Sequence, residues 1–142
     1  MVKRKKKTDL QKAKEILWNL CKKIIFEKHN KNGQVYCYTC GAGPLEGSNK
    51  QLGHFIPSSV CSTELKYSLE NLKFQCFSCN IWKSGNWVAY EKHLIQDNGE
   101  NFIKELKARN EKTKGLMYRL DWYEVRIFYY QKIVDNFIEK VS

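Results

Sequence analysis

The sequence predicts an α+β fold in which a small, zinc-stapled core is flanked by α-helices at both ends. Two Cys-x-x-Cys pairs, at 37–40 and 76–79, bracket a stretch punctuated by Gly and Pro, as is typical of short strands and turns. Before and after that stretch, apolar residues recur at helical spacing. The 142 residues suit one domain, so we expect a disordered arm over residues 1–8 and a single domain over 9–142. Within the domain we expect an N-terminal helix at 9–30, a zinc-bearing core at 35–86 and a helical part at 87–142.

The N-terminal quarter carries most of the positive charge. The chain has a net charge of +10, and residues 1–36 hold 11 Lys or Arg against 3 Asp or Glu. The densest block is the arm itself, which contains Lys3, Arg4, Lys5, Lys6 and Lys7. Such an excess predicts a polyanionic partner, most simply nucleic acid, and the arm residues are candidate nucleic-acid contacts. A solubilising tail is the alternative.

An amphipathic helix is expected at about residues 9–29. Thr8 is placed to cap it, and Gln11 stands at the capping-box position three residues later. Apolar residues follow at spacings of three and four, with Cys21 among them, so this cysteine is predicted to be a core residue. The run 30–33, Asn-Lys-Asn-Gly, ends the pattern.

The central stretch is expected to contain two short strands and a helix. Residues 51–56 form a plausible strand that brings His54 near its end, and residues 57–75 read as a loop followed by an extended piece that carries Asn71. A helix is expected to begin near Cys79 and to end at 84–85, Ser-Gly.

Three further helices are predicted after the second cysteine pair. Asn86 is placed to cap the first, at about 87–97, and the second covers 100–112 with Phe102, Ile103 and Leu106 facing inward. The last helix runs from Asp121 to about residue 140. Its predicted buried side consists of Trp122, Val125, Phe128, Tyr129, Ile133, Phe137 and Val141. This stripe is interpreted as core or as the face of a homodimer.

The four paired cysteines predict a structural zinc site. Cys37, Cys40, Cys76 and Cys79 have the spacing of a tetrahedral site with four thiolate ligands. Reduced cysteines packed in a core, or a redox pair, are the alternatives, and no thioredoxin-like pattern surrounds either pair. Cys61 lies between the pairs and is left outside the site.

One histidine and two asparagines are the candidate chemical groups. His54 can act as a general base, and the Asn80 oxygen can bind a hard cation such as Mg2+, with Mn2+ as a substitute. Asn71 is interpreted as a support that hydrogen-bonds backbone and fixes the His54 loop. Lys83, three residues after Asn80, is expected on the same helical face, where it is a candidate contact to phosphate. A core histidine, a turn asparagine and a surface lysine are the structural alternatives.

These motifs resemble those of a known family. Gly53-His54, Glu70-Asn71-Leu72 and Cys76-x-x-Cys79-Asn80-x-x-Lys83 with the first cysteine pair are similar to the zinc-bearing HNH endonucleases. The run 76–86, with Tyr90 downstream, resembles more closely the NinG (Rap) recombination proteins of lambdoid phages. The resemblance implies a treble-clef-like ββα-metal core and a Mg2+-dependent endonuclease that hydrolyses branched DNA such as Holliday junctions and D-loops.

The sequence departs from the wider HNH pattern at one position. Many HNH sites have an acidic metal ligand immediately before the histidine, whereas this chain has Gly53 there. Asn80 is then the one protein ligand of the catalytic cation that can be named. The competing hypothesis is a four-cysteine zinc finger that binds DNA without cutting it, as an accessory in recombination or transcription.

Membrane insertion is not expected from this sequence. No run of 18 apolar residues occurs, and the basic N-terminus lacks an apolar signal segment. We therefore expect a cytoplasmic protein, in a bacterial host if it is encoded by a phage.

Overall fold

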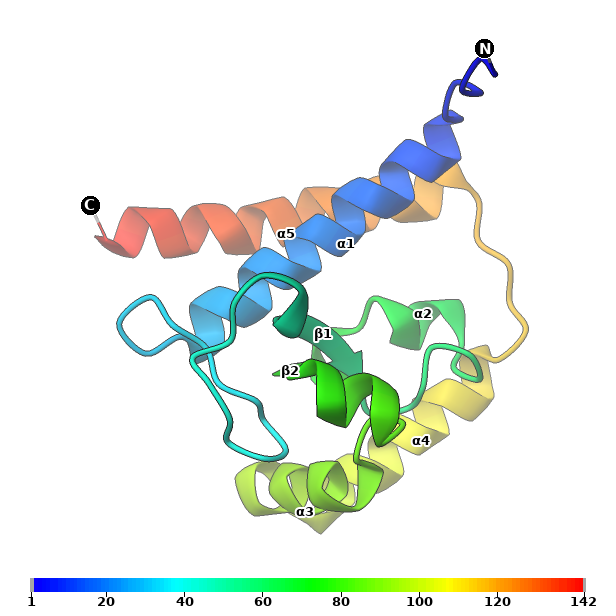
Figure 1. The fold of residues 1–142 in the computed structure, drawn as a ribbon. Helices are drawn as coiled ribbons and strands as arrows, with labels where there is room; N and C mark the ends of the chain where they lie inside the picture. The colour runs from blue at the N-terminus through cyan, green and yellow to red at the C-terminus, as the bar shows by residue number, and fades with distance from the viewer. Residues whose placement is uncertain (1, 142) are drawn as a thin grey trace.

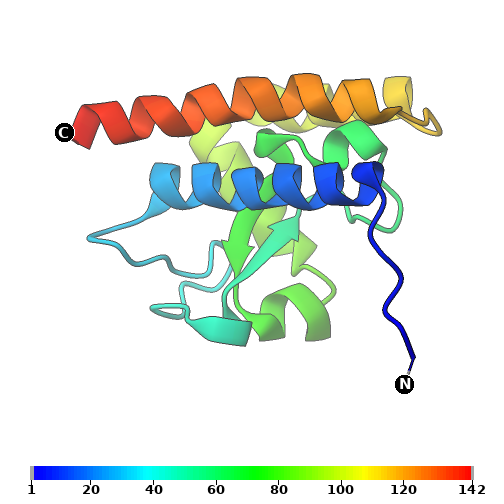
Figure 2. The same cartoon turned by 90° about the horizontal axis from the view of Figure 1, so that it is seen from above.

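A computed structural model describes residues 2–141 of the chain. Two long helices, α1 (Asp9–His29) and α5 (Leu120–Val141), lie side by side and run in the same direction along one side of the molecule (Figures 1 and 2). A small sheet lies beneath them, and the shorter helices cover its other side (Figure 1). The prediction of a mixed fold with a small sheet and helices at both ends is confirmed at this level.

Helix α1 forms where local sequence signals placed it. The Thr8 hydroxyl accepts a hydrogen bond from the Gln11 amide, and the Gln11 side chain accepts one from the Thr8 amide, which completes the predicted capping box. The buried face of the helix consists of Ala13, Leu17, Leu20, Cys21, Ile24 and Ile25. Cys21 is a core residue as predicted, since its side chain is fully buried.

The sheet has two antiparallel strands, β1 (Gln51–His54) and β2 (Leu72–Gln75), in which Gly53 pairs with Lys73 and His54 with Leu72. The first strand is two residues shorter than predicted. It ends at His54, although Phe55 still donates its backbone amide to the Asn71 carbonyl, because Asn71 already belongs to the turn before β2. Asn71 itself lies in the short helical turn η2 (Leu69–Asn71) immediately before β2, and not in an extended piece as predicted.

The remaining helices arrange the second half of the core. Helix α2 (Thr63–Lys66), which the sequence pattern did not predict, lies in the connection between the strands, and the turn η1 (Gly47–Asn49) precedes β1. A π-helical turn, η3 (Ser78–Trp82), begins within the second cysteine pair and includes Cys79. Helices α3 (Trp87–Asn98) and α4 (Glu100–Thr113) agree with the predicted ranges, and Ile103 and Leu106 of α4 are buried as expected.

Two buried clusters connect these layers. One joins α1, α5 and the sheet with the cysteine-bearing turns. The other joins the residues after β1 with α2, α3 and α4, and its members are Phe55, Leu65, Tyr90, Leu94, Ile103 and Leu106. Within residues 2–141, no helix combines the length and hydrophobicity needed to cross a bilayer.

The buried face of α5 differs from the prediction. Val125, Phe128 and Tyr129 are more than half exposed, whereas Tyr123, Tyr130 and Val134 are buried. Helix α5 carries aromatic residues on several faces, so its sequence pattern did not identify the face that packs. The side chain of Val141 lies outside the described residues. Val125, Phe128 and Tyr129 are thus not core residues, and a homodimer through them remains a prediction.

Candidate functional site

The four paired cysteines converge on one point. The Sγ atoms of Cys37, Cys40, Cys76 and Cys79 all lie within 4.8 Å of one another. The Sγ atoms of Cys40 and Cys76 are 3.7 Å apart, and a tetrahedral site with Zn–S bonds of about 2.3 Å has an edge of about 3.8 Å. The cluster could therefore hold a metal ion such as zinc.

Neighbouring groups donate hydrogen bonds to the sulfur atoms of this cluster, which stabilises thiolates. The backbone amide of Cys79 donates to Cys76 Sγ at 3.4 Å, and Asn86 Nδ2 donates to Cys79 Sγ at 3.5 Å. Burial raises the pKa of the Cys76 thiol, so a thiolate at this position requires a cation beside it. Asn86 precedes α3 as predicted, but its side chain makes no capping hydrogen bond and turns to the sulfur instead.

The other two cysteines lie outside the cluster. Cys21 is buried in the core against the Tyr67 carbonyl, and burial raises its pKa to about 12. Cys61 is partly buried and packs against the cluster of α2, α3 and α4. Neither position has the low pKa that a reactive thiol needs.

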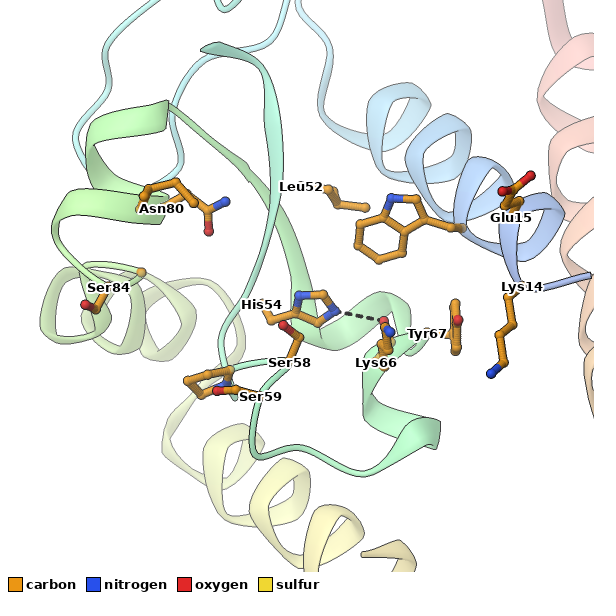
Figure 3. Close-up of a pocket in the computed structure, with 14 residues that line it drawn as sticks. Lys14, Glu15, Leu52, His54, Ser58, Ser59, Lys66, Tyr67, Asn80 and Ser84 are labelled. Carbon is orange, nitrogen blue, oxygen red and sulfur yellow. Dashed lines mark hydrogen bonds between the residues drawn. The ribbon is translucent and has the colours of Figure 1, made fainter. Parts of the chain in front are cut away.

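A cleft of about 800 Å3 opens beside the sheet, and we call it the His54 cleft. Its lining includes Lys14, Trp18, His54, Lys66, Asn80 and Ser84. Figure 3 shows His54 reaching this cleft from the end of β1, and Asn80 reaching it from η3. The structure thus brings together the histidine and the asparagine that the sequence singled out.

His54 is held in one orientation. Its Nε2 atom lies 2.9 Å from the Lys66 carbonyl oxygen, which can only accept, so Nε2 carries the proton and Nδ1 is the free acceptor. The indole of Trp18 stacks on the imidazole with ring centroids 5.4 Å apart and planes 12° apart. Burial lowers the pKa of His54, and this favours the neutral ring that a proton acceptor requires.

Asn71 braces the loop behind His54. It is fully buried, and its Oδ1 accepts from the Ile56 amide at 2.7 Å. Its Nδ2 donates to the carbonyls of Ile56 and Leu65, both at 3.1 Å. These bonds connect the residues after His54 to Leu65. The carbonyl of the following residue, Lys66, is the one that orients the His54 ring.

Asn80 presents its oxygen toward Gly53. Its Nδ2 donates to Gln51 Oε1 at 2.8 Å, which fixes the amide plane. A β-carbon built on Gly53 would lie 3.1 Å from Asn80 Oδ1 and 1.9 Å from Gln75 Oε1. A side chain at position 53 would therefore overlap Gln75, and the glycine is a packing requirement of this structure.

Gln75 is the residue of this region that the sequence pattern did not identify. It is fully buried, and its Nε2 donates to Thr39 Oγ1 at 3.1 Å and to the Gly85 carbonyl at 2.8 Å. Its Oε1 is the one buried side-chain polar atom without a hydrogen-bond partner among the described residues. The signal that could have found it was Gly53, whose missing side chain leaves room for a neighbour across the sheet.

Lys83 is not brought into the His54 cleft. It is exposed at the end of η3 and is not among the described residues that line the cleft. The expectation of a shared face assumed α-helical geometry, whereas this turn is π-helical and wider, so a spacing of three residues no longer aligns two side chains.

The basic arm begins beside the cleft. Residues 2–7 are exposed and precede α1 without regular structure. Lys7 Nζ lies 2.6 Å from a carboxylate oxygen of Glu15, and Glu15 lines the His54 cleft. Lys7, the last residue of the basic block, therefore lies at the rim of the cleft. Met1 lies outside the described residues.

Comparisons with known proteins give a consistent family assignment. The family described as "Bacteriophage Lambda NinG protein" matches residues 1–137. Protein ninG of Escherichia phage lambda is 26% identical over 99 residues, which cover 70% of this chain and 46% of that protein. Protein ninG of Salmonella phage P22 is 28% identical over 78 residues, or 55% of this chain and 37% of that protein.

The chain spans about half the length, or less, of the relatives it matches. No solved structure matches it. Because the family match covers nearly the whole chain, from residue 1 to residue 137, it extends well beyond the cysteine pairs that carry the most specific motifs. The chain belongs to the bacteriophage NinG family.

Proposed function

We propose that this protein is a metal-dependent DNA endonuclease of the HNH type that hydrolyses phosphodiester bonds in branched recombination intermediates. The observation that carries the proposal is the His54 cleft, which an oriented imidazole and the side chain of Asn80 line together, next to a four-cysteine cluster. The likeness of the motifs to HNH endonucleases supplies the reaction class, and the likeness to NinG (Rap) recombination proteins supplies the branched substrate.

His54 is the general base in this proposal. Because Nε2 donates to the Lys66 carbonyl, Nδ1 accepts the proton of the attacking water, and the resulting imidazolium is stabilised by the same carbonyl. Trp18 and the braced loop keep the ring from rotating away. The low pKa of His54 keeps it unprotonated at neutral pH.

The residues around Gly53 fit a hard divalent cation. Asn80 Oδ1 is the protein ligand, with its amide nitrogen committed to Gln51, and neutral oxygen donors suit Mg2+, which retains several waters and binds substrate phosphate. When bound, Mg2+ would neutralise charge on the scissile phosphate and the leaving oxygen. Zinc at the four cysteines would have a separate role, which is to hold the turn that carries Asn80 against the sheet.

The charges of the molecule support DNA as the substrate. Lys14 and Lys66 line the His54 cleft, and the arm with Lys3, Arg4, Lys5 and Lys6 begins at its rim. Phosphate contacts by such groups attract DNA without regard to sequence. Recognition by shape is therefore the simpler account of selectivity for branched DNA.

Cleavage of synthetic DNA tests the proposal. Zinc-loaded protein is incubated with Mg2+ and labelled four-way junction, D-loop, flap, linear duplex or single-stranded DNA. Wild type and the control variant His29→Ala, which alters an exposed histidine outside the cleft, should cut the junction. His54→Ala should bind junction with unchanged affinity and lose cleavage by at least about 100-fold.

The same experiment decides between the two hypotheses. If wild type binds branched DNA but leaves every substrate intact with Mg2+ or Mn2+, the protein is a non-catalytic zinc-finger DNA-binding accessory. If His54→Ala cuts as fast as wild type, the cleft is not the catalytic site.

A further inference from the structure

The side-chain amide of Gln75 is fixed by its nitrogen and unsatisfied at its oxygen. Both protons of Nε2 have acceptors, Thr39 Oγ1 and the Gly85 carbonyl, and these bonds set which way the amide faces. Reversing the amide would place two oxygens, those of Gln75 and Gly85, against one another. Oε1 therefore faces Gly53, buried and without a hydrogen-bond partner among the described residues. A buried, unpaired carbonyl is unfavourable unless something binds it.

Asn80 repeats this arrangement from the other side. Its Nδ2 is held by Gln51, and its Oδ1 points to the same place beside Gly53. The two oxygens are 1.9 Å and 3.1 Å from one reference point, the position of a Gly53 β-carbon, so they lie within about 5 Å of each other. Neighbouring ligands of Mg2+ are about 2.9 Å apart and opposite ligands about 4.2 Å apart.

The backbone explains how two separate segments reach one point. Gln75 pairs with Gln51 across the sheet and Gly53 with Lys73, so Gln75 is the diagonal neighbour of Gly53 on one face of the sheet. Asn80 approaches that face from η3. Since Gly53 has no side chain, none of its atoms separates the two amide oxygens.

We propose that Gln75 Oε1 is a second protein ligand of the divalent cation bound by Asn80, and that it takes the place of an acidic side chain at position 53. This inference rests on the proposed function, since it concerns the same cation. Two neutral ligands leave the charge of the cation uncompensated, so its affinity is low until a DNA phosphate adds a negative ligand.

Metal binding by variants of the zinc-loaded protein tests the proposal without reference to activity. Free Mn2+ is measured by electron paramagnetic resonance in the absence of DNA. Gln75→Met, which keeps the length but removes the oxygen, should weaken Mn2+ binding at least tenfold. Gln75→Glu, which adds a charged oxygen, should strengthen it by a similar factor. The control Gln131→Met changes an exposed residue of α5 and should have no effect.

The opposite signs distinguish a ligand from a brace. Both Gln75 variants lose Nε2 and its bonds to Thr39 and Gly85. If Gln75 only braces the structure, both variants should weaken Mn2+ binding alike, and that result would overturn the proposal. Zinc content and the thermal midpoint without Mn2+ show whether each variant is folded.

A measurement on wild type covers the case in which the variants fail to fold. Anomalous scattering from Mn2+-soaked crystals should place the ion within about 2.5 Å of both Gln75 Oε1 and Asn80 Oδ1. An ion bound to Asn80 but distant from Gln75 overturns this inference and leaves the proposed function intact. If crystals with intact zinc sites bind no ion at Asn80, even when they contain DNA and Mn2+ is in excess, both fail.

Discussion

Replacing Gly53 with alanine should destabilise the protein through one specific contact. The added β-carbon would lie 1.9 Å from Gln75 Oε1 and 2.8 Å from Gln75 Cδ, well inside contact distance. Gln75 is fully buried, so its side chain cannot move into solvent without leaving its two hydrogen bonds to Thr39 and Gly85.

The magnitude follows from two alternative responses. If Gln75 stays, the crowding costs about 1–3 kcal/mol, as for an overpacked core. If Gln75 moves, two hydrogen bonds are lost at about 0.5–1.5 kcal/mol each. Only one of these two costs applies at a time, so the free energy of unfolding should fall by about 1–3 kcal/mol. For a chain of this size, the Tm should fall by roughly 3–10 °C.

Thermal unfolding of zinc-loaded protein, followed by circular dichroism, measures the effect. The matched background is Gln75→Ala, in which both crowded atoms are absent. There Gly53→Ala should cost less than about 0.5 kcal/mol, because the two substitutions act through one contact and are not additive. An equal loss in both backgrounds would refute the contact as the cause.

Three further outcomes are expected. Removal of zinc with a strong chelator should unfold the core, because the cluster joins segments 37–40 and 76–79; a Tm that is unchanged by chelation would exclude a structural zinc. Because burial lowers the pKa of His54, the cleavage rate should persist as the pH falls below about 6.5. The free energy of unfolding should decline over the same range, since the unfolded chain takes up the proton first. A His54→Gln variant with the same pH dependence of stability would contradict this assignment. Replacing residues 3–6 with glutamine, while keeping Lys7 and its partner Glu15, should weaken DNA binding. The slope of log affinity against log salt should become less steep by up to about 0.9 per charge removed. An unchanged slope would show that the arm does not contact phosphate.

Local sequence signals predicted where the helices begin and end more accurately than which of their faces are buried. Helix α1 was predicted within a residue because its capping box and apolar spacing act within the helix itself. The range of α5 was predicted equally well, but its buried face was not. Tyr130 is buried in the core, where its hydroxyl donates to the Tyr67 carbonyl, 63 residues away in sequence. The apolar spacing within α5 carries no information about so distant a partner.

The candidate site shows the same division. The convergence of the four cysteines was predictable, because two Cys-x-x-Cys pairs in one domain are typical of a four-cysteine metal site. The role of Gln75 depends on a glycine across the sheet and an asparagine on the next turn, and only the folded chain shows the three together. Lys83 was misplaced because a π-helical turn has no distinctive sequence pattern.

The stacking of Trp18 on His54 has a consequence for the order in which the protein matures. Trp18 belongs to α1, whose apolar face packs on α5, and α5 follows both cysteine pairs along the chain. During translation the two cysteine pairs are complete some forty residues before α5 begins. The four cysteines can therefore come together before α5 is made, whereas the helix that carries Trp18 gains its largest packing partner only when α5 has been synthesised.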